Sequence, residues 1–225
     1  MLEAYLQQEH GASCHHILIT LQKEKFTAAS ALYTYFLTQH KKVTLFCSEE
    51  IDPRFSFLPW FEKVRLKRPR QYDCEIVIEA DALELYSLFT KYELRLNAKM
   101  AMALYCGIYE AFEALQSEAC DGMVFAALSS LIQKGASHAL CVQQLHKRQP
   151  LFRMRLRARL FGAFRLIEDA KVALLPVNLD DLEATGSSYE ELYSTARELL
   201  NIVHVQEVRI VALGEEDTIL KIIKG

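Results

Sequence analysis

The chain has 225 residues, an apolar fraction of 51% and a formal net charge of -3. This length and composition are enough to bury one large core or two smaller ones. The near-neutral charge gives no overall attraction to nucleic acid or to a membrane surface. No apolar run approaches the ~20 residues that a membrane helix needs, and the first residues, MLEAYLQQEH, make a poor signal peptide.

Six cysteines are scattered along the chain without a C-x-x-C pair. Most of them lie in apolar stretches such as VTLFC and MALYCGI. A zinc site needs clustered spacing, so we expect buried free thiols in a reducing compartment, and we predict a cytoplasmic protein without a membrane partner. The cysteines are Cys14, Cys47, Cys74, Cys106, Cys120 and Cys141.

The first eighty residues alternate short apolar runs with a helical pattern. Buried strands are predicted for ILITL (17–21), VTLFC (43–47) and YDCEIVIEA (72–80), and an amphipathic helix for AASALYTYFLTQ between the first two. Strands that are separated by a helix favour a parallel, doubly wound sheet.

A helical segment follows, from Leu83 to about Phe164. Its apolar residues recur at three- and four-residue spacings, which is typical of amphipathic helices. Gly135 follows Lys134 and predicts the end of one helix, and Ser137 predicts the cap of the next.

After this segment the pattern returns to strands. FRLIED and KVALLPVNL predict a hairpin, YEELYSTARELLNI a helix that is introduced by the capping residues at 185–188, and EVRIVALGE and TILKIIKG two final strands. The predicted fold class is α/β, with a parallel, doubly wound sheet and a helical segment followed by a smaller α+β domain. The predicted boundaries are an α/β domain over 1–150, an Arg-rich interdomain helix over 151–164 and the α+β domain over 165–225.

Several phrases, in this order, resemble the DHH phosphoesterases, in particular the branch of nanoRNases and phosphoadenosine-phosphate phosphatases. FSFLPWFEKV resembles a phrase after the family's second strand, and the stretch from ALYCGIYEAF to LIQKGAS resembles its central helices. LHKRQPLFRMRLRARLF resembles its interdomain helix, and VNLDDLEATGSSYEEL the start of its second-domain helix. The resemblance covers nearly the whole chain. It implies two α/β domains around a cleft, and phosphoester hydrolysis with two Mn²⁺ or Mg²⁺ ions.

The residues that should hold those ions are mostly replaced. The family's first-turn His falls on Thr20, and its two first-turn Asp residues fall on Glu24 and Phe26, so that Phe26 would place an apolar ring in the cavity. A third-strand Asp falls on Glu79, and an Asp on a later helix falls on Ala111.

The Asp-His-His motif of the family has no counterpart, because IVIEADALELYSLF passes from strand directly into helix. The family's glycine-rich phosphate-binding loop also has no counterpart in the sequence up to Gly225. Only Glu24 and Glu79 remain as candidate metal ligands, and two carboxylates cannot fill the coordination shells of two hard cations. We therefore predict no catalytic residue, no metal site and no cofactor, with Mn²⁺ or Mg²⁺ as the alternative.

Two basic clusters are candidates for binding phosphate or nucleic acid. Lys67, Arg68 and Arg70 lie in EKVRLKRPRQ, and Arg155 and Arg159 share one face of the Arg-rich helix. Such a helix could bind phosphates or single-stranded RNA. Salt bridges to an acidic partner or to acids of its own second domain are the other interpretation.

The sequence thus predicts a catalytically degenerate DHH-phosphoesterase-like protein rather than an enzyme. Its predicted partner is another protein, a nucleotide or a short RNA. The alternative is a Mn²⁺- or Mg²⁺-dependent phosphoesterase with a divergent site that acts on phosphoadenosine phosphate or oligoribonucleotides. A homo-oligomer with a buried cleft is a third possibility.

Overall fold

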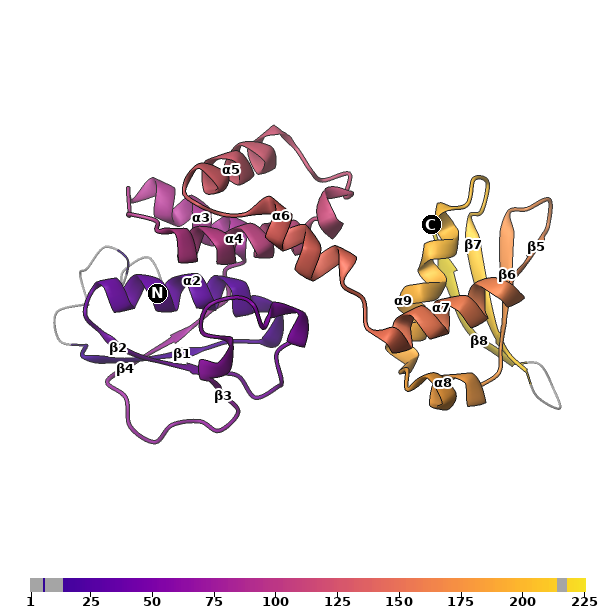
Figure 1. The fold of residues 1–225 in the computed structure, drawn as a ribbon, viewed down its shortest axis with the longest axis horizontal. Helices are drawn as coiled ribbons and strands as arrows, with labels where there is room; N and C mark the ends of the chain where they lie inside the picture. Colours follow the sequence, from indigo (N-terminus) through magenta and orange to yellow (C-terminus); the bar gives the residue numbers. More distant parts are fainter. Residues whose placement is uncertain (1–5, 7–13, 214–217) are drawn as a thin grey trace. The chain divides into compact units, whose positions relative to one another are not determined.

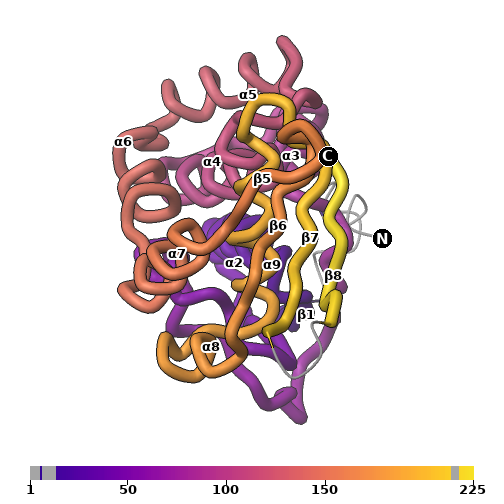
Figure 2. The backbone as a smooth tube through the Cα atoms, turned by 90° about the vertical axis from the view of Figure 1, so that its right-hand side faces the viewer, coloured from indigo at the N-terminus to yellow at the C-terminus, as the bar shows by residue number. Residues whose placement is uncertain are grey.

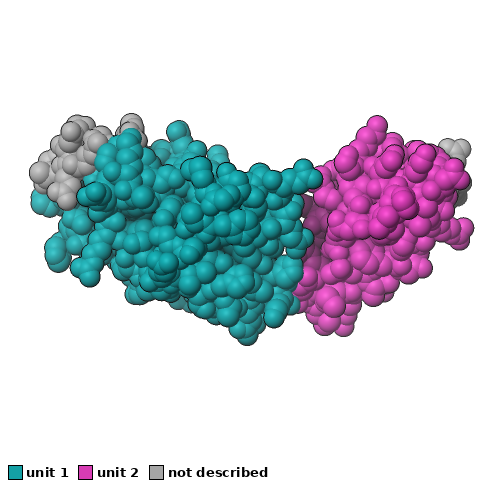
Figure 3. Space-filling model, turned by 90° about the horizontal axis from the view of Figure 1, so that it is seen from above, with its two compact units in different colours: residues 1–148 teal, residues 149–225 magenta. Residues whose placement is uncertain are grey.

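The structure is a computed structural model that describes Leu6, residues 14–213 and residues 218–225. The chain divides into two compact units, residues 1–148 and residues 149–225, which Figure 3 colours separately. The helix that the sequence places between the domains belongs to the second unit, where it packs on that unit's sheet. No helix in the described part of the chain is long and apolar enough to cross a membrane.

The first unit is built on a four-stranded parallel sheet with the order β3-β2-β1-β4 (Figure 1). Its strands are β1 (His16–Thr20), β2 (Lys42–Phe46), β3 (Val64–Arg65) and β4 (Cys74–Val77). Strands β2 and β3 lie on one side of β1, and β4 lies on the other, so the strand order reverses between β1 and β4. Such a reversal is the switch point of a doubly wound sheet. The sequence predicted three of these strands and missed the two-residue β3.

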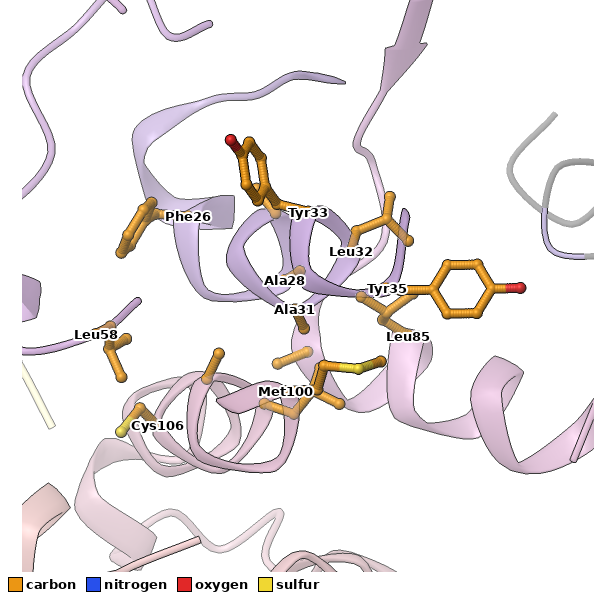
Figure 4. Close-up of a cluster of buried hydrophobic side chains, with 14 of the residues drawn as sticks. Phe26, Ala28, Ala31, Leu32, Tyr33, Tyr35, Leu58, Leu85, Met100 and Cys106 are labelled. Atoms are coloured by element: carbon orange, nitrogen blue, oxygen red, sulfur yellow. The ribbon is translucent and has the colours of Figure 1, made fainter. Parts of the chain in front are cut away.

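Helix α2 (Phe26–Thr38) is enclosed instead of amphipathic. All of its residues from Phe26 to Phe36 are buried, because one side packs on β2 and another on α4 (Ala98–Ala111). Figure 4 shows Ala28 and Ala31 of α2 facing α4, with Met100 close to them. Small side chains at this contact let the two helix backbones approach closely.

The first unit contains further helical segments, of which α3, α5 and α6 contact α4. They are η1 (Lys23–Lys25), η2 (Pro53–Phe55), η3 (Phe61–Lys63), α3 (Ala82–Lys91), η4 (Glu113–Leu115), α5 (Gly122–Gln133), α6 (His138–Cys141) and the π-helical η5 (Val142–Lys147).

The helix ends that were predicted from local sequence are confirmed. Gly135 has a φ of 103°, a left-handed conformation that favours glycine after a helix. The hydroxyl of Ser137 accepts the N–H of Leu140 and caps α6. Ser188 and Glu191 form a capping box at the start of α9.

The second unit has a four-stranded sheet with the order β5-β6-β7-β8. Its elements are α7 (Leu151–Ala163), β5 (Arg165–Ile167), β6 (Val172–Val177), α8 (Asp180–Thr185), α9 (Tyr189–Arg197), η6 (Glu198–Asn201), β7 (Glu207–Ala212) and β8 (Thr218–Lys224). The hairpin of β5 and β6 is confirmed, β6 and β7 are parallel, and β7 and β8 are antiparallel. Helices α7 and α9 pack on the sheet from one side (Figure 2). Leu156 and Leu160 of α7 and Leu192 of α9 are buried in this contact.

Cys14 and Cys74 form a disulfide, so the prediction of six free thiols is wrong for this pair. Cys14 lies just before β1, and Cys74 opens β4, which pairs with β1 so that Cys74 lies opposite Ile17. Adjacent strands thus bring the two Cα atoms to 6.0 Å, a separation that disulfides span. The other four cysteines are free.

The disulfide gives a testable prediction about stability. It closes a loop with a sequence separation of 60, so Cys14→Ser should lower the free energy of unfolding of the oxidised chain by about 4 kcal/mol. Urea unfolding measures the difference. Cys120→Ser is the matched control, because Cys120 is free and half-buried. Wild-type chain that unfolds at the same urea concentration with and without reductant would contradict the prediction.

Candidate ligand-binding site

A cavity of about 520 Å³ lies beyond the carboxyl ends of β1, β2 and β4. Its lining comes from the segments that follow these strands, which are η1, η2 and the start of α3, together with the first turn of α2 and the end of α4. Ligands of open α/β sheets bind outside the carboxyl ends of the strands, where the strand order reverses. The volume is also within the range of small-molecule sites. We call this space the switch-point cavity.

The lining of the switch-point cavity is divided between apolar and charged residues. The apolar or small residues are Thr27, Ala28, Phe55, Ala82, Gly107 and Ala111. The cationic residues are Lys23, Lys25 and Arg54, and the acidic residues are Glu24, Asp52, Asp81 and Glu110. Charges of both signs therefore face one small, partly apolar space.

Arg54 is the most heavily bonded side chain of the cavity. Its Nε donates to Oδ2 of Asp52 at 2.8 Å, and its Nη2 donates to Oε2 of Glu110 at 3.1 Å. Its Nη1 donates to the carbonyl oxygen of Leu145 at 3.2 Å. Asp52 in turn accepts the backbone N–H of Arg54 at 2.8 Å and caps η2. The guanidinium thus joins η2, α4 and η5.

The pKa values of this group show which force dominates at each residue. Burial by itself would lower the pKa of Arg54, but the Glu110 and Asp52 carboxylates outweigh it, so the pKa of Arg54 is raised. Burial raises the pKa of Glu110, and Arg54 cancels only part of that rise. The pKa shift of Arg54 thus follows from its two carboxylate partners, and the pKa shift of Glu110 follows from burial.

The structure separates the two carboxylates that the sequence offered as metal ligands. Glu24 is exposed and lines the cavity, whereas Glu79 is exposed and does not line it. Asp81, two residues further on, lines it instead, and its Oδ1 accepts the backbone N–H of Glu84 at 2.8 Å as the cap of α3.

Phe26 does not enter the cavity, so the expectation of an apolar ring there is wrong. Its side chain is fully buried and packs edge-on against Phe61, with ring centroids 5.8 Å apart. The ring of Phe26 also contacts that of Phe55, with ring centroids 6.2 Å apart, and Phe55 is part of the cavity lining. Ala111 does line the cavity, where its methyl group offers no ligand atom.

These donor groups do not fit a pair of hard cations. Two of the four carboxylates, those of Asp52 and Glu110, are engaged by Arg54, and Asp81 caps a helix. None of the described lining residues is a histidine. Within residues 14–213 and 218–225, no three His, Cys, Asp or Glu side chains gather as a metal-binding group. A two-metal site needs several oxygen or nitrogen ligands around each ion.

Of the five basic residues that the sequence singled out, Arg68 and Arg159 form ion pairs within their own units. Arg68 donates to the hydroxyl of Tyr72 at 3.0 Å and pairs with Glu75 at 2.5 Å, while Lys67 and Arg70 are exposed.

The Arg-rich helix α7 likewise contains both ion-paired and exposed arginines. Arg159 forms an ion pair with Asp181, and Arg157 pairs with Glu198 at 2.6 Å. Arg155 remains exposed. For two of these arginines, the salt bridges lead to acids of the second unit itself.

Asp52, Arg54 and Glu110 were missed by the sequence analysis. The phrase IDPRF does carry a local signal, because Asp before Pro is typical of a capped turn. The partner Glu110 lies 56 residues further on, so no local pattern reveals the ion pair.

Comparison with known proteins supports the fold. No family model and no curated protein matches the chain. Among solved structures, an exopolyphosphatase-related protein from Bacteroides fragilis aligns with a TM-score of 0.75 and 10% identity, over 94% of this chain and 79% of that one. A putative family II inorganic pyrophosphatase from Methanococcus jannaschii reaches a TM-score of 0.30 at 12% identity, over 78% of this chain and 58% of that one, which is too low to carry weight. The first likeness confirms the predicted α/β fold class.

Gly107 allows a prediction about the wall of the cavity. A Cβ at this position would lie 2.5 Å from Cβ of Ala82 and overlap the hydroxyl of Thr27. Gly162 in α7 has open space instead. Both alanine variants gain similar helix propensity, so Gly107→Ala should be less stable than Gly162→Ala by about 2 kcal/mol, measured by urea unfolding. Equal stabilities would show that α4 can move away from α3 without cost.

Arg54 allows a second prediction, about stability and pH. Arg54→Leu leaves two carboxylates without their cation, so it should lower the free energy of unfolding by about 2 kcal/mol near neutral pH. The pKa of Glu110 is already raised by burial and should rise further. A carboxyl with a raised pKa in the folded state loses stability as pH rises, so the variant should be less impaired at about pH 5 than at about pH 7.

Urea unfolding at the two pH values measures this effect. Arg70→Leu, at an exposed position in the same unit, is the control. A destabilisation by Arg54→Leu that does not change with pH would show that lost packing, and not lost charge pairing, is its cause.

Proposed function

We propose that this chain is a degenerate DHH-type phosphoesterase whose switch-point cavity binds a nucleotide without two-metal hydrolysis. One observation carries the proposal, namely that Arg54 lies in the cavity in ion pairs with Asp52 and Glu110. A cation held there repels divalent metal ions and engages carboxylates that would otherwise bind them. The donor set therefore supports binding better than metal-dependent chemistry.

The cationic side of the cavity supports an anionic ligand. Lys25 is the N-cap residue of α2, whose cap has no side-chain hydrogen bond, and no acid lies in the first turn of that helix. The start of a long helix carries a partial positive charge that favours phosphate. Lys23 also lines the cavity, although its ammonium pairs with Glu49 at 3.0 Å.

The apolar side supports a ligand with a hydrophobic part. Ala28, Ala82, Gly107 and Ala111 leave space where larger side chains would fill the cavity. A nucleoside monophosphate combines an anionic group with an apolar base, and the volume of about 520 Å³ is sufficient for one.

Calorimetric titration of the full chain with AMP and with phosphoadenosine phosphate tests the proposal. We expect binding without added metal, and at least about tenfold weaker binding by Lys25→Ala, because a charged hydrogen bond contributes about 1.5–3 kcal/mol. Lys134→Ala, at an exposed position that does not line the cavity, should bind like wild type. Equal affinities of the two variants would contradict the proposal.

Hydrolysis assays distinguish nucleotide binding from the alternative function, a Mn²⁺- or Mg²⁺-dependent phosphoesterase. Glu24 lines the cavity and is exposed, so it is the carboxylate best placed to hold an ion there. Release of phosphate or nucleotides in the presence of Mn²⁺, abolished by Glu24→Gln, would show a phosphoesterase with a divergent site. Salt-sensitive binding of short RNA that is lost in Arg155→Ala with Arg159→Ala would instead place the ligand on α7.

A further inference from the structure

The second unit has a separate concavity of about 470 Å³ between α9 and β8. Tyr193, Ser194 and Arg197 line it from the helix, and Lys221 and Lys224 line it from the strand. Its two walls belong to one compact unit. We call it the α9–β8 pocket.

The charge of this pocket is unbalanced. Arg197, Lys221 and Lys224 all line it, and none of its described lining residues is acidic. Glu207 lies opposite Lys224 in the strand register, but its carboxylate pairs with Arg209 at 2.5 Å.

Other arginines of the second unit show the opposite arrangement. Arg157, Arg159 and Arg209 are each ion-paired with an acid of that unit. Within residues 149–213 and 218–225, no such pair is found for Arg197, Lys221 or Lys224. Like charges gathered around one concavity repel each other, and a multiply charged anion between them removes that repulsion.

The side chains of α9 that line the pocket lie on one face of the helix and can contact the same ligand. Tyr193 and Arg197 are four residues apart and Ser194 and Arg197 three, so they share one face of the helix. The Nζ of Lys221 lies 4.2 Å from the centre of the Tyr193 ring, which places this ammonium over the helix side of the pocket. Ser194 accepts a hydrogen bond from Arg153 at 3.4 Å, so its own O–H remains available as a donor.

We propose that the α9–β8 pocket binds a doubly charged phosphate group, either free or esterified. Guanidinium and ammonium groups donate hydrogen bonds and cannot accept them, and phosphate oxygens accept them, so the donor set matches this anion. Tyr193 and the neighbouring Tyr189, with ring centroids 6.2 Å apart, offer an aromatic surface beside it for an ester that carries a ring. This site belongs to the second unit and does not depend on the function proposed for the first.

Titration of the ¹⁵N-labelled full chain with inorganic phosphate and with phenyl phosphate tests the proposal. We expect saturable shifts of the amide signals of Ser194, Arg197, Lys221 and Lys224. Arg197→Ala and Lys221→Ala should each weaken binding at least about tenfold, because each removes a charged hydrogen bond. Tighter binding of phenyl phosphate would identify an aromatic ester as the ligand class, and equal binding would identify the phosphate group alone.

Matched controls keep the test specific. Arg165→Ala and Lys171→Ala remove exposed cations of the same unit that do not line the pocket, and both should bind like wild type. Weakening by these controls as large as that by Arg197→Ala would mean diffuse attraction and overturn the proposal. So would the absence of shifts at millimolar phosphate.

Lys25→Ala distinguishes this site from the switch-point cavity, which Lys25 lines. The shifts of Ser194, Arg197, Lys221 and Lys224 should saturate at the same phosphate concentration in this variant as in wild type. If Lys25→Ala abolished these shifts and Lys221→Ala left them unchanged, the phosphate would be in the first unit and the α9–β8 pocket would be excluded.

Discussion

The ion pairs of Arg54 with Asp52 and Glu110 determine the character of the first unit's cavity. A half-buried guanidinium needs anionic partners, and these partners then lose their capacity to bind another cation. The same guanidinium also donates to the carbonyl oxygen of Leu145, so it joins η5 to the two segments, η2 and α4, that line the cavity. The chemistry available in this space therefore follows from a contact that also stabilises its walls.

The packing of α2 explains how the fold tolerates changes at the cavity. The helix is enclosed between the sheet and α4, and its contact with α4 depends on small residues such as Ala28, Ala31 and Gly107. These contacts involve no charged group of the cavity. A scaffold whose stability comes from such packing can exchange polar residues at the carboxyl ends of its strands, which agrees with a shared fold at 10% identity.

The sequence predicted features that depend on neighbouring residues and missed those that depend on strand order or helix packing. The strands other than β3, the helix end at Gly135 and the helix cap at Ser188 follow from local pattern. The disulfide of Cys14 with Cys74 requires knowing that β4 lies beside β1. Likewise, Asp81 and not Glu79 lines the cavity because of where β4 ends and α3 begins. Apolar periodicity in the sequence locates such a boundary only approximately.

The balance of charge within each unit is a better guide to candidate anion sites than the density of arginine in the sequence. Helix α7 is the most Arg-rich element, yet Arg157 and Arg159 are neutralised by acids of their own unit. Arg197, Lys221 and Lys224, which are spread over α9 and β8, line the α9–β8 pocket, and none of the described residues of its lining is acidic. Because they are distant in sequence and meet only when β8 pairs with β7 beside α9, no motif could reveal them. Unbalanced charge at a concave surface is energetically costly for the free protein, and an anionic ligand is the simplest means of relieving it.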